Sequence, residues 1–142
     1  MPRRLHQLVL VIVPAAAAFL LGAAFAADKP KERYFEMRTY VTSPGKLDAL
    51  HARFRDHTNK LFEKHGMTLI GYWTPSEGEE AKNTLIYILA YPDKESRKKS
   101  WDAFQEDPEW KKVKAETEAK GPIVAQVKPS LFLKPTDYSP IK

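Results

Sequence analysis

Few residues of this chain are equipped for acid–base or metal chemistry. Cysteine is absent, and three of the four histidines, His51, His57 and His65, lie in one stretch with helical spacing. At about 100° per residue, His51 and His57 fall on well-separated faces of a helix, so they do not form the i, i+4 pair of a zinc-binding helix. We therefore expect no metal site.

His57 is the histidine that the spacing places on an apolar helix face, three residues after Phe54 and four before Leu61. The ordinary pKa of an imidazole, about 6.5, suits a general base or a group that orients a polar ligand atom. The alternative is a core histidine bonded to a backbone carbonyl or a strand hydroxyl. We predict His57 as the catalytic residue of any reaction that the protein performs.

Four large aromatic residues form a second candidate group: Tyr72, Trp73, Tyr87 and Trp101. Each phenol or indole ring combines apolar area with one polar atom, which suits the wall of a small-molecule pocket. We predict that these four side chains line a ligand pocket between a sheet and its helices. The same residue types also fill protein cores and subunit interfaces, so both interpretations stay open.

Glu36, Arg38 and Tyr40 alternate along one predicted strand and therefore point to the same face of it. On a sheet that packs against a second subunit, an acid and a base two residues apart favour an ion pair between the subunits. We predict a dimer interface at these three residues. The alternatives are a ligand carboxylate bound by Arg38 and a catalytic pair of Glu36 with Arg38.

The hydrophobic pattern predicts the elements that position these residues. Period-two alternation predicts strands, helical spacing of apolar residues predicts helices, and Pro, Gly and Asp mark the ends. The predicted order is a strand over 34–41, a helix over 46–65, strands over 67–74 and 84–91, helical segments capped by Asp93 and Asp107, and a strand over 123–133. This β-α-β-β-α-β order predicts an α+β, ferredoxin-like fold with a four-stranded antiparallel sheet.

The predicted sheet is apolar on both faces. In its third strand Leu85 and Leu89 point to one side, while Ile86 and Ile88 point to the other. The helices cover one face only, and a large uncovered apolar face is unfavourable in water. We therefore predict a homodimer in which a second copy covers the other face, the alternative being a monomer with an exposed apolar sheet.

The segment Glu36-Met37-Arg38-Thr39-Tyr40 resembles the E-x-R-x-Y opening strand of NIPSNAP-domain proteins. Similar blocks follow in the same order: Pro44-Gly45-Lys46, His57, Leu61, Lys64-His65-Gly66, Gly71-Tyr72-Trp73, Asn83-Thr84-Leu85, Ala90-Tyr91 and Asp107-Pro108-Glu109-Trp110. The resemblance covers residues 34–134 and implies a dimeric α/β barrel, in which two ferredoxin-like subunits pack sheet to sheet. That group includes cofactor-free monooxygenases. Many family members have a histidine in the third strand where this chain has Tyr87, so chemistry that needs that histidine is not expected here.

Residues 1–26 have the pattern of an export signal. Two arginines precede an apolar run over 8–21, and small residues lead to a predicted cleavage between Ala26 and Ala27. The protein is then periplasmic or secreted, with a polar leader over 27–32, a domain over 33–135 and a tail over 136–142. We expect contact with a membrane only if the signal stays uncleaved.

The net charge and the absence of known motifs exclude several classes of function. Two of the positive charges behind the net charge of +5 lie in the predicted signal, and the rest of the chain has a mixed surface without a nucleic-acid platform. Nucleotide-binding glycine motifs are absent, so no cofactor is expected. We predict binding of a small, partly apolar molecule in a cleft between the first helix and the sheet. The alternatives are cofactor-free monooxygenase or isomerase-like turnover with His57, and a structural or protein-binding dimer without a ligand.

Overall fold

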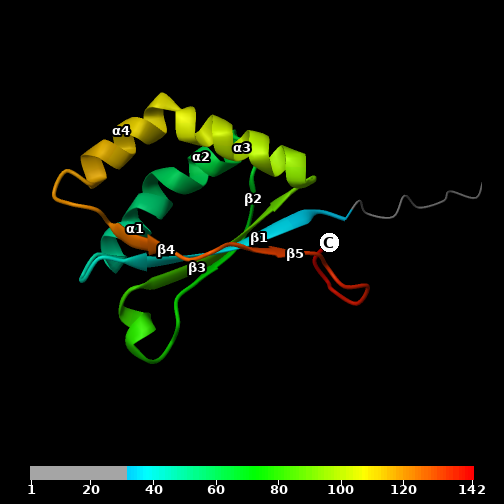
Figure 1. Cartoon of the computed structure of the whole chain (residues 1–142), viewed down its shortest axis with the longest axis horizontal. Coiled ribbons are helices and arrows are strands. Elements are labelled where there is room, and N and C mark those ends of the chain that lie inside the picture. Colours follow the sequence, from blue (N-terminus) through cyan, green and yellow to red (C-terminus); the bar gives the residue numbers. More distant parts are fainter. Residues whose placement is uncertain (1–31) are drawn as a thin grey trace, which may run out of the picture.

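The helices lie together on one face of an antiparallel sheet (Figure 1). This computed structural model describes residues 32–142, so the predicted signal and its cleavage site at Ala26 and Ala27 lie outside the described residues. The elements are β1 (Tyr34–Thr42), α1 (Leu47–Arg53), the π-helical turn η1 (Phe54–Thr58), α2 (Asn59–Lys64), β2 (Thr68–Trp73), the 3-10 turn η2 (Glu79–Lys82), β3 (Thr84–Tyr91), α3 (Lys94–Glu106), α4 (Pro108–Thr117), β4 (Val124–Val127) and β5 (Leu131–Leu133).

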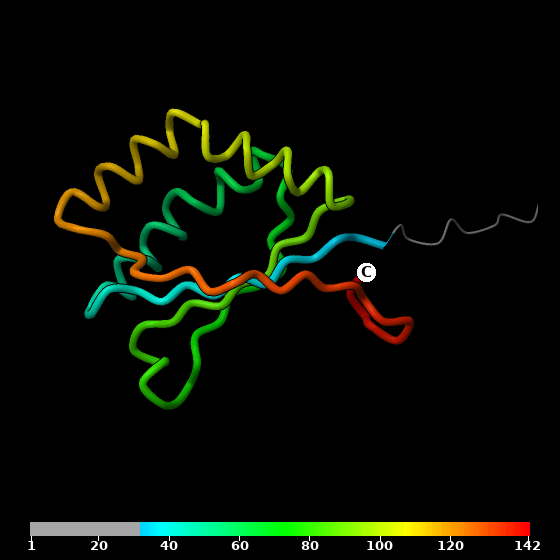
Figure 2. Tube along the Cα trace, viewed as in Figure 1, coloured from blue at the N-terminus to red at the C-terminus, as the bar shows by residue number. Residues whose placement is uncertain are grey.

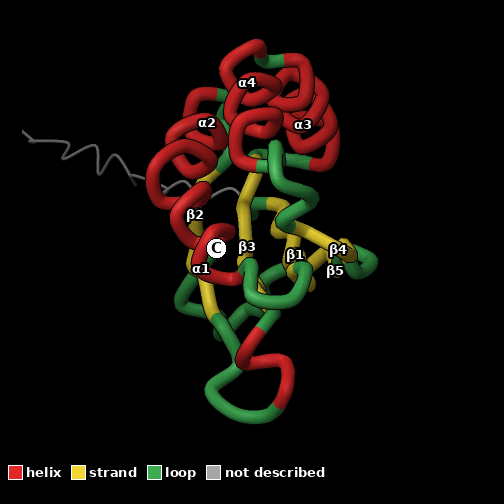
Figure 3. Tube along the Cα trace, turned by 90° about the vertical axis from the view of Figure 1, so that its left-hand side faces the viewer, coloured by secondary structure: helices red, strands yellow, loops and turns green. Residues whose placement is uncertain are grey.

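The strand order confirms the ferredoxin-like fold. The strands run β2-β3-β1-β4, β5 also pairs with β1, and all pairs are antiparallel. In the β1–β3 register Arg38 lies opposite Tyr87 and Tyr40 lies opposite Leu85. A view along the sheet shows the helices in one layer and the strands in the other, with the β2–β3 loop extending away from both (Figure 3).

The last predicted strand is divided into β4 and β5, so the prediction of one strand over 123–133 is wrong. Pro129 lies between the two pieces and has no backbone N–H to donate to a neighbouring strand. Lys128 still donates its N–H to the Thr39 carbonyl at 2.9 Å, and β5 resumes pairing with β1. The chain trace follows both pieces along β1 into the C-terminal tail (Figure 2).

The predicted helix ends are confirmed at three positions. The side chain of Asp93 accepts a hydrogen bond from the Ser96 N–H at 2.7 Å, and that of Asp107 accepts one from the Glu109 N–H at 2.8 Å. Both satisfy N–H groups that lack a partner within the first helical turn. Gly66 follows α2 with a φ of +77°, a conformation that favours glycine at the end of a helix.

The core lies between the helices and the sheet and is rich in aromatic rings. Leu85, Tyr87, Leu89 and Tyr91 point from β3 toward the helices and are almost completely buried. Rings of Phe54, Phe62, Tyr72, Trp101, Phe104 and Trp110 continue this layer, with centroid separations down to 4.6 Å. Such edge and stacked contacts add to the gain from apolar burial.

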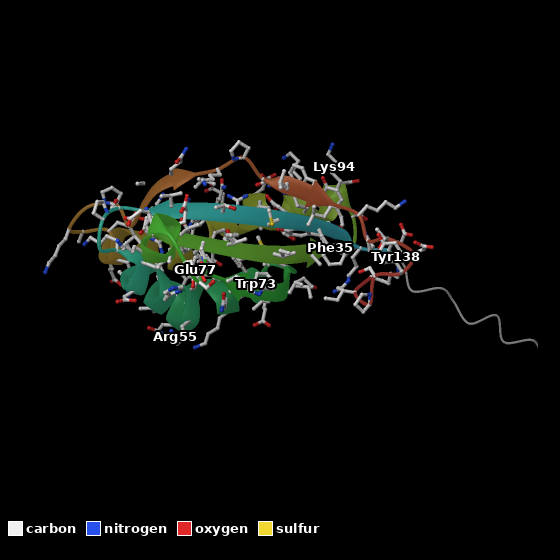
Figure 4. All side chains as sticks on the ribbon, turned by 90° about the horizontal axis from the view of Figure 1, so that it is seen from below. Phe35, Arg55, Trp73, Glu77, Lys94 and Tyr138 are labelled. Atoms are coloured by element: carbon white, nitrogen blue, oxygen red, sulfur yellow. The ribbon has the colours of Figure 1, made fainter. Side chains whose placement is uncertain are left out.

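The other face of the sheet is open within the chain. Ile86 and Ile88 are only half-buried there, although they lie in the central part of the sheet. Seen from this side the strands lie in front of the helices, and Tyr138 of the tail lies near Phe35 at one end (Figure 4). The tail therefore borders one end of this face, where Ile141 lines a recess together with Phe35 and Ile88.

Candidate functional site

An open cavity of about 360 Å³ lies where the helices meet the sheet edge formed by β1 and β4. Four aromatic side chains line it: Phe54 of η1, Phe62 of α2, Phe104 of α3 and Trp110 of α4. Val124 and Val127 of β4 complete the apolar part of the lining. The volume is within the range of small-molecule sites, about 300–1,000 Å³.

Polar groups in the lining come from β1, from the first helical stretch, which α1, η1 and α2 form together, and from α4 with its C-terminal end. Tyr40 extends from β1, Arg53 and Thr58 from the first helical stretch, and Lys114 and Glu118 from α4 and its end. Nη1 of Arg53 donates to Oε1 of Glu118 at 2.8 Å. Few polar atoms in a mostly aromatic lining are typical of a site that holds and orients an organic molecule.

The π-helical turn η1 shapes this side of the cavity. The Asn59 N–H bonds to the Phe54 carbonyl five residues earlier, and the Thr58 hydroxyl donates to the Arg53 carbonyl at 3.2 Å. A π turn has a wider hydrogen-bonded ring than an α-helix, and such turns are frequent at functional sites. As a result Arg53, Phe54 and Thr58 all face inward and are buried.

The prediction that His57 faces the sheet is wrong. His57 is exposed within η1, and the buried position that follows Phe54 belongs to Thr58, which is 2% exposed. The inward-facing positions Phe54, Thr58 and Phe62 follow one another at intervals of four residues, so the position three residues after Phe54 turns to solvent. His57 does not line the cavity, and the general-base role assigned to it has no support from its position.

The four predicted pocket aromatics do not line this cavity. Tyr87 is fully buried and stacks on Tyr72 with ring centroids 5.7 Å apart. Trp101 is buried beneath α3, where its Nε1 donates to the Tyr91 hydroxyl at 2.8 Å. Tyr72 alone lines a recess between the first helix and the sheet, a smaller one of about 260 Å³. Tyr87 and Trp101 are therefore core residues.

Trp73 lies on the open face of the sheet and is 51% exposed, so its assignment to a pocket beneath the helices is wrong. The pairing of β2 with β3 shifts register between Leu69 and Gly71, which changes the alternation along the strand. The Trp73 ring lies over Gly71, and a Cβ built there would come within 2.5 Å of it. A side chain at position 71 would therefore displace the Trp73 ring from this position.

The predicted dimer interface at Glu36, Arg38 and Tyr40 is assigned to the wrong face. These side chains lie beneath the helices, and Glu36 is fully buried. Arg97 of α3 binds both oxygens of the Glu36 carboxylate, through Nη2 at 2.7 Å and Nε at 3.0 Å. This charged face turns inward because α3 and the segment before β5 supply the partners that neutralise it.

Further hydrogen bonds complete the surroundings of Glu36. Its carboxylate accepts from Arg38 at 2.8 Å, Ser130 at 2.8 Å, Trp101 at 3.0 Å and Tyr91 at 3.1 Å. Burial raises the pKa of this carboxyl, but hydrogen bonds from Arg97 and Ser130 and the charge of Arg38 outweigh it, and the pKa is lowered to about 2. Glu36 is therefore a buried anion at neutral pH, and it joins the strand to α3.

Arg38 connects the Glu36 cluster to the cavity. Its guanidinium lies 4.3 Å from the centre of the Trp101 ring, and its Nη2 donates to the Tyr40 hydroxyl at 3.4 Å. Tyr40 in turn lines the cavity. The E-x-R-x-Y strand thus extends from a buried ion cluster to the cavity lining.

The sequence interpretation missed three charged residues of the lining, Arg53, Lys114 and Glu118. Arg53 lies three residues after Leu50, on the buried side of the first helix. A charged residue at a buried helical position was the signal in the sequence that could have identified it. Lys114 and Glu118 lie in a Lys/Glu-rich stretch and cannot be separated by pattern from its solvated neighbours.

Residues 32–142 contain neither a helix that could span a membrane nor a cluster of metal-binding side chains. Within that range no helix is long and apolar enough to cross a bilayer. The same range holds no group of three or more histidine and carboxylate side chains placed to bind a metal ion.

The fold and sequence match known proteins of one family. The NIPSNAP family model matches residues 35–140, whereas no curated protein matches the chain significantly. The structure is similar to a NIPSNAP family protein of unknown function from Agrobacterium tumefaciens, with a TM-score of 0.68 and 20% identity, covering 80% of this chain and 97% of that one. A NIPSNAP-like domain protein from Burkholderia xenovorans gives a TM-score of 0.67 and 21% identity, covering 78% and 91%.

The likeness extends more weakly to an enzyme of the same fold. A monooxygenase from Streptomyces coelicolor, crystallised with the ligand nanaomycin D, has a TM-score of 0.51 and 9% identity, covering 78% of this chain and 94% of that one. At this identity the match concerns the fold alone. The chain belongs to the NIPSNAP family and has the ferredoxin-like fold of the dimeric α/β barrels.

Proposed function

We propose that this NIPSNAP-domain protein binds a small, partly apolar molecule in the cavity between its first helix, α4 and the β1–β4 edge. The observation that carries the proposal is the aromatic lining of a 360 Å³ cavity, with Tyr40 and Arg53 as polar groups within it. A ring system that packs against Phe54, Phe62 and Trp110 would bury its apolar surface away from water, which favours binding.

Saturation-transfer NMR with 2-naphthylmethanol, a neutral two-ring probe, tests the proposal. We expect contact signals with the wild-type protein and none with Val124→Trp, whose indole would fill the cavity from β4. Ala115→Trp is the matched control, because Ala115 is exposed on α4 and does not line the cavity. Signals that survive unchanged in a folded Val124→Trp protein would contradict the proposal.

Cofactor-free turnover of the bound molecule is not supported by the position of His57. Its predicted base, His57, is exposed outside the cavity, and the fold is shared by proteins with different activities. The cavity lining supports binding and orientation through Tyr40, Arg53 and Lys114.

We propose also that a second copy of the chain covers the open face of the sheet. Ile86 and Ile88 lie half-buried in the middle of this face, and Trp73 is exposed beside them. A face of this composition gains free energy when another apolar surface excludes water from it. Sheet-to-sheet packing would leave the cavity beneath the helices open in both copies.

Export remains a proposal that rests on residues 1–26 alone. We propose that the chain is periplasmic or secreted after cleavage between Ala26 and Ala27. Cell fractionation followed by N-terminal sequencing tests it. An N-terminus at Ala27 in the exported fraction is the expected result, and an intact chain in the cytoplasmic fraction would contradict it.

A further inference from the structure

The charged groups of the cavity indicate which ligands it selects. Arg53 is only 4% exposed, and its guanidinium lies 5.4 Å from the centre of the Trp110 ring. An arginine carries five N–H donors, of which one here goes to Glu118, whereas the buried Nε has no hydrogen-bond partner within residues 32–142. A buried donor without a partner is costly, so a rearrangement on binding that brings an acceptor to it would be favourable.

The position of Glu118 allows its carboxylate to separate from Arg53. It caps the C-terminal end of α4, and its side chain is 21% exposed, so it reaches both Arg53 and solvent. While Glu118 is paired, the Arg53 charge is compensated, which avoids the cost of a lone buried cation. Lys114, one helical turn earlier, adds a second positive charge to the same lining.

We propose that the cavity selects aromatic carboxylates, and that the ligand carboxylate replaces Glu118 as the partner of Arg53. This inference rests on the proposed binding function and adds the charge of the ligand to it. The planar guanidinium binds a carboxylate through two parallel N–H···O bonds, and the aromatic residues around it accept the ring. Glu118 then turns to solvent, where its charge is hydrated.

Isothermal titration calorimetry with 2-naphthoate and the neutral 2-naphthylmethanol tests the selection. We expect the wild-type protein to bind naphthoate at least about tenfold more tightly than the alcohol, because its carboxylate forms two N–H···O bonds to Arg53 where Glu118 forms one. Arg53→Met should abolish this preference and still bind the alcohol, which also shows that the variant is folded. Glu118→Gln should raise the affinity for naphthoate several-fold because it removes the competing carboxylate.

Arg55→Met is the matched control. Arg55 lies two residues from Arg53 but is exposed and does not line the cavity, so its removal should leave both affinities unchanged. If the wild-type protein binds both probes equally, the selection for carboxylates is overturned while the binding function stands. If it binds neither probe, the binding function fails as well.

Discussion

Arg97 in α3 donates hydrogen bonds to both carboxylate oxygens of Glu36 in β1, at 2.7 Å and 3.0 Å. This bidentate pair crosses from the helical layer to the sheet, and Glu36 is fully buried at its centre. Arg38 and Ser130 approach the same carboxylate from other parts of the chain. The pair therefore ties α3, β1 and the segment before β5 to one buried charge.

Replacing this carboxylate should strongly destabilise the fold. In Glu36→Gln the amide cannot compensate Arg97 and Arg38, so the free energy of unfolding should fall by about 3–5 kcal/mol. Urea unfolding followed by circular dichroism measures the change. Glu95→Gln, which removes an exposed carboxylate paired only along the helix, should change it by less than about 0.5 kcal/mol. Similar losses of unfolding free energy in both variants would mean that the buried cluster contributes no more to stability than an exposed ion pair.

The same carboxylate should make stability depend on acid pH. Its pKa is lowered from 4.5 to about 2 in the folded protein, so Glu36 stabilises the folded state fully above pH 4.5 and loses this contribution as the pH falls toward 2. The shift corresponds to about 3 kcal/mol. Urea unfolding at pH 7, 4 and 2.5 should show the difference between wild type and Glu36→Gln shrinking with the pH, whereas a constant difference would contradict this assignment.

The buried Tyr91 and the partly buried Tyr72 should respond differently to loss of the hydroxyl. In Tyr91→Phe the core loses the hydrogen bonds to Glu36 and Trp101, and the free energy of unfolding should fall by about 1–3 kcal/mol. The Tyr72 hydroxyl is buried without a hydrogen-bond partner in residues 32–142, so Tyr72→Phe should be neutral or stabilising by about 1 kcal/mol. Thermal unfolding of both variants measures this, and a marked loss in Tyr72→Phe would reveal a partner for that hydroxyl.

Two histidines of the first helical stretch should also differ. Nε2 of His65 lies 2.7 Å from the Asp107 carboxylate that caps α4, so His65→Ala should lower the free energy of unfolding by about 1 kcal/mol. His57 is exposed, and His57→Ala should change neither stability nor binding of 2-naphthylmethanol measurably. A loss of binding in His57→Ala would restore the role predicted from its sequence position.

The fold was predictable because its signals are local. Alternation in β1, the Asp93 and Asp107 caps and Gly66 each act within a few residues, and together they indicate the element order. The division of the last strand at Pro129 follows from a missing N–H, a signal that was present in the sequence but outweighed by the apolar residues on both sides.

The candidate cavity agrees with the sequence prediction only in its general location, between the first helix and the sheet. Inward-facing positions spaced by four residues through η1 leave His57 outward. The register shift before Gly71 moves Trp73 to the open face, because one additional residue in a strand reverses the direction of the side chains after it. Glu36 faces inward because Arg97, which lies 61 residues away in the sequence, meets it there. Period counting along one strand contains no information about such a partner.

The open face supplies the last prediction. If a second copy covers it, sedimentation velocity should give the mass of two chains for the wild-type protein and of one chain for Ile88→Lys, because a lysine in the middle of the face leaves a charge without water or a partner. Ala115→Lys places the same side chain on the exposed surface of α4 and should remain a dimer. A wild-type protein that sediments as one chain at micromolar concentration would contradict the dimer. Because the cavity lies beneath the helices, Ile88→Lys should still bind 2-naphthylmethanol, which separates assembly from ligand binding.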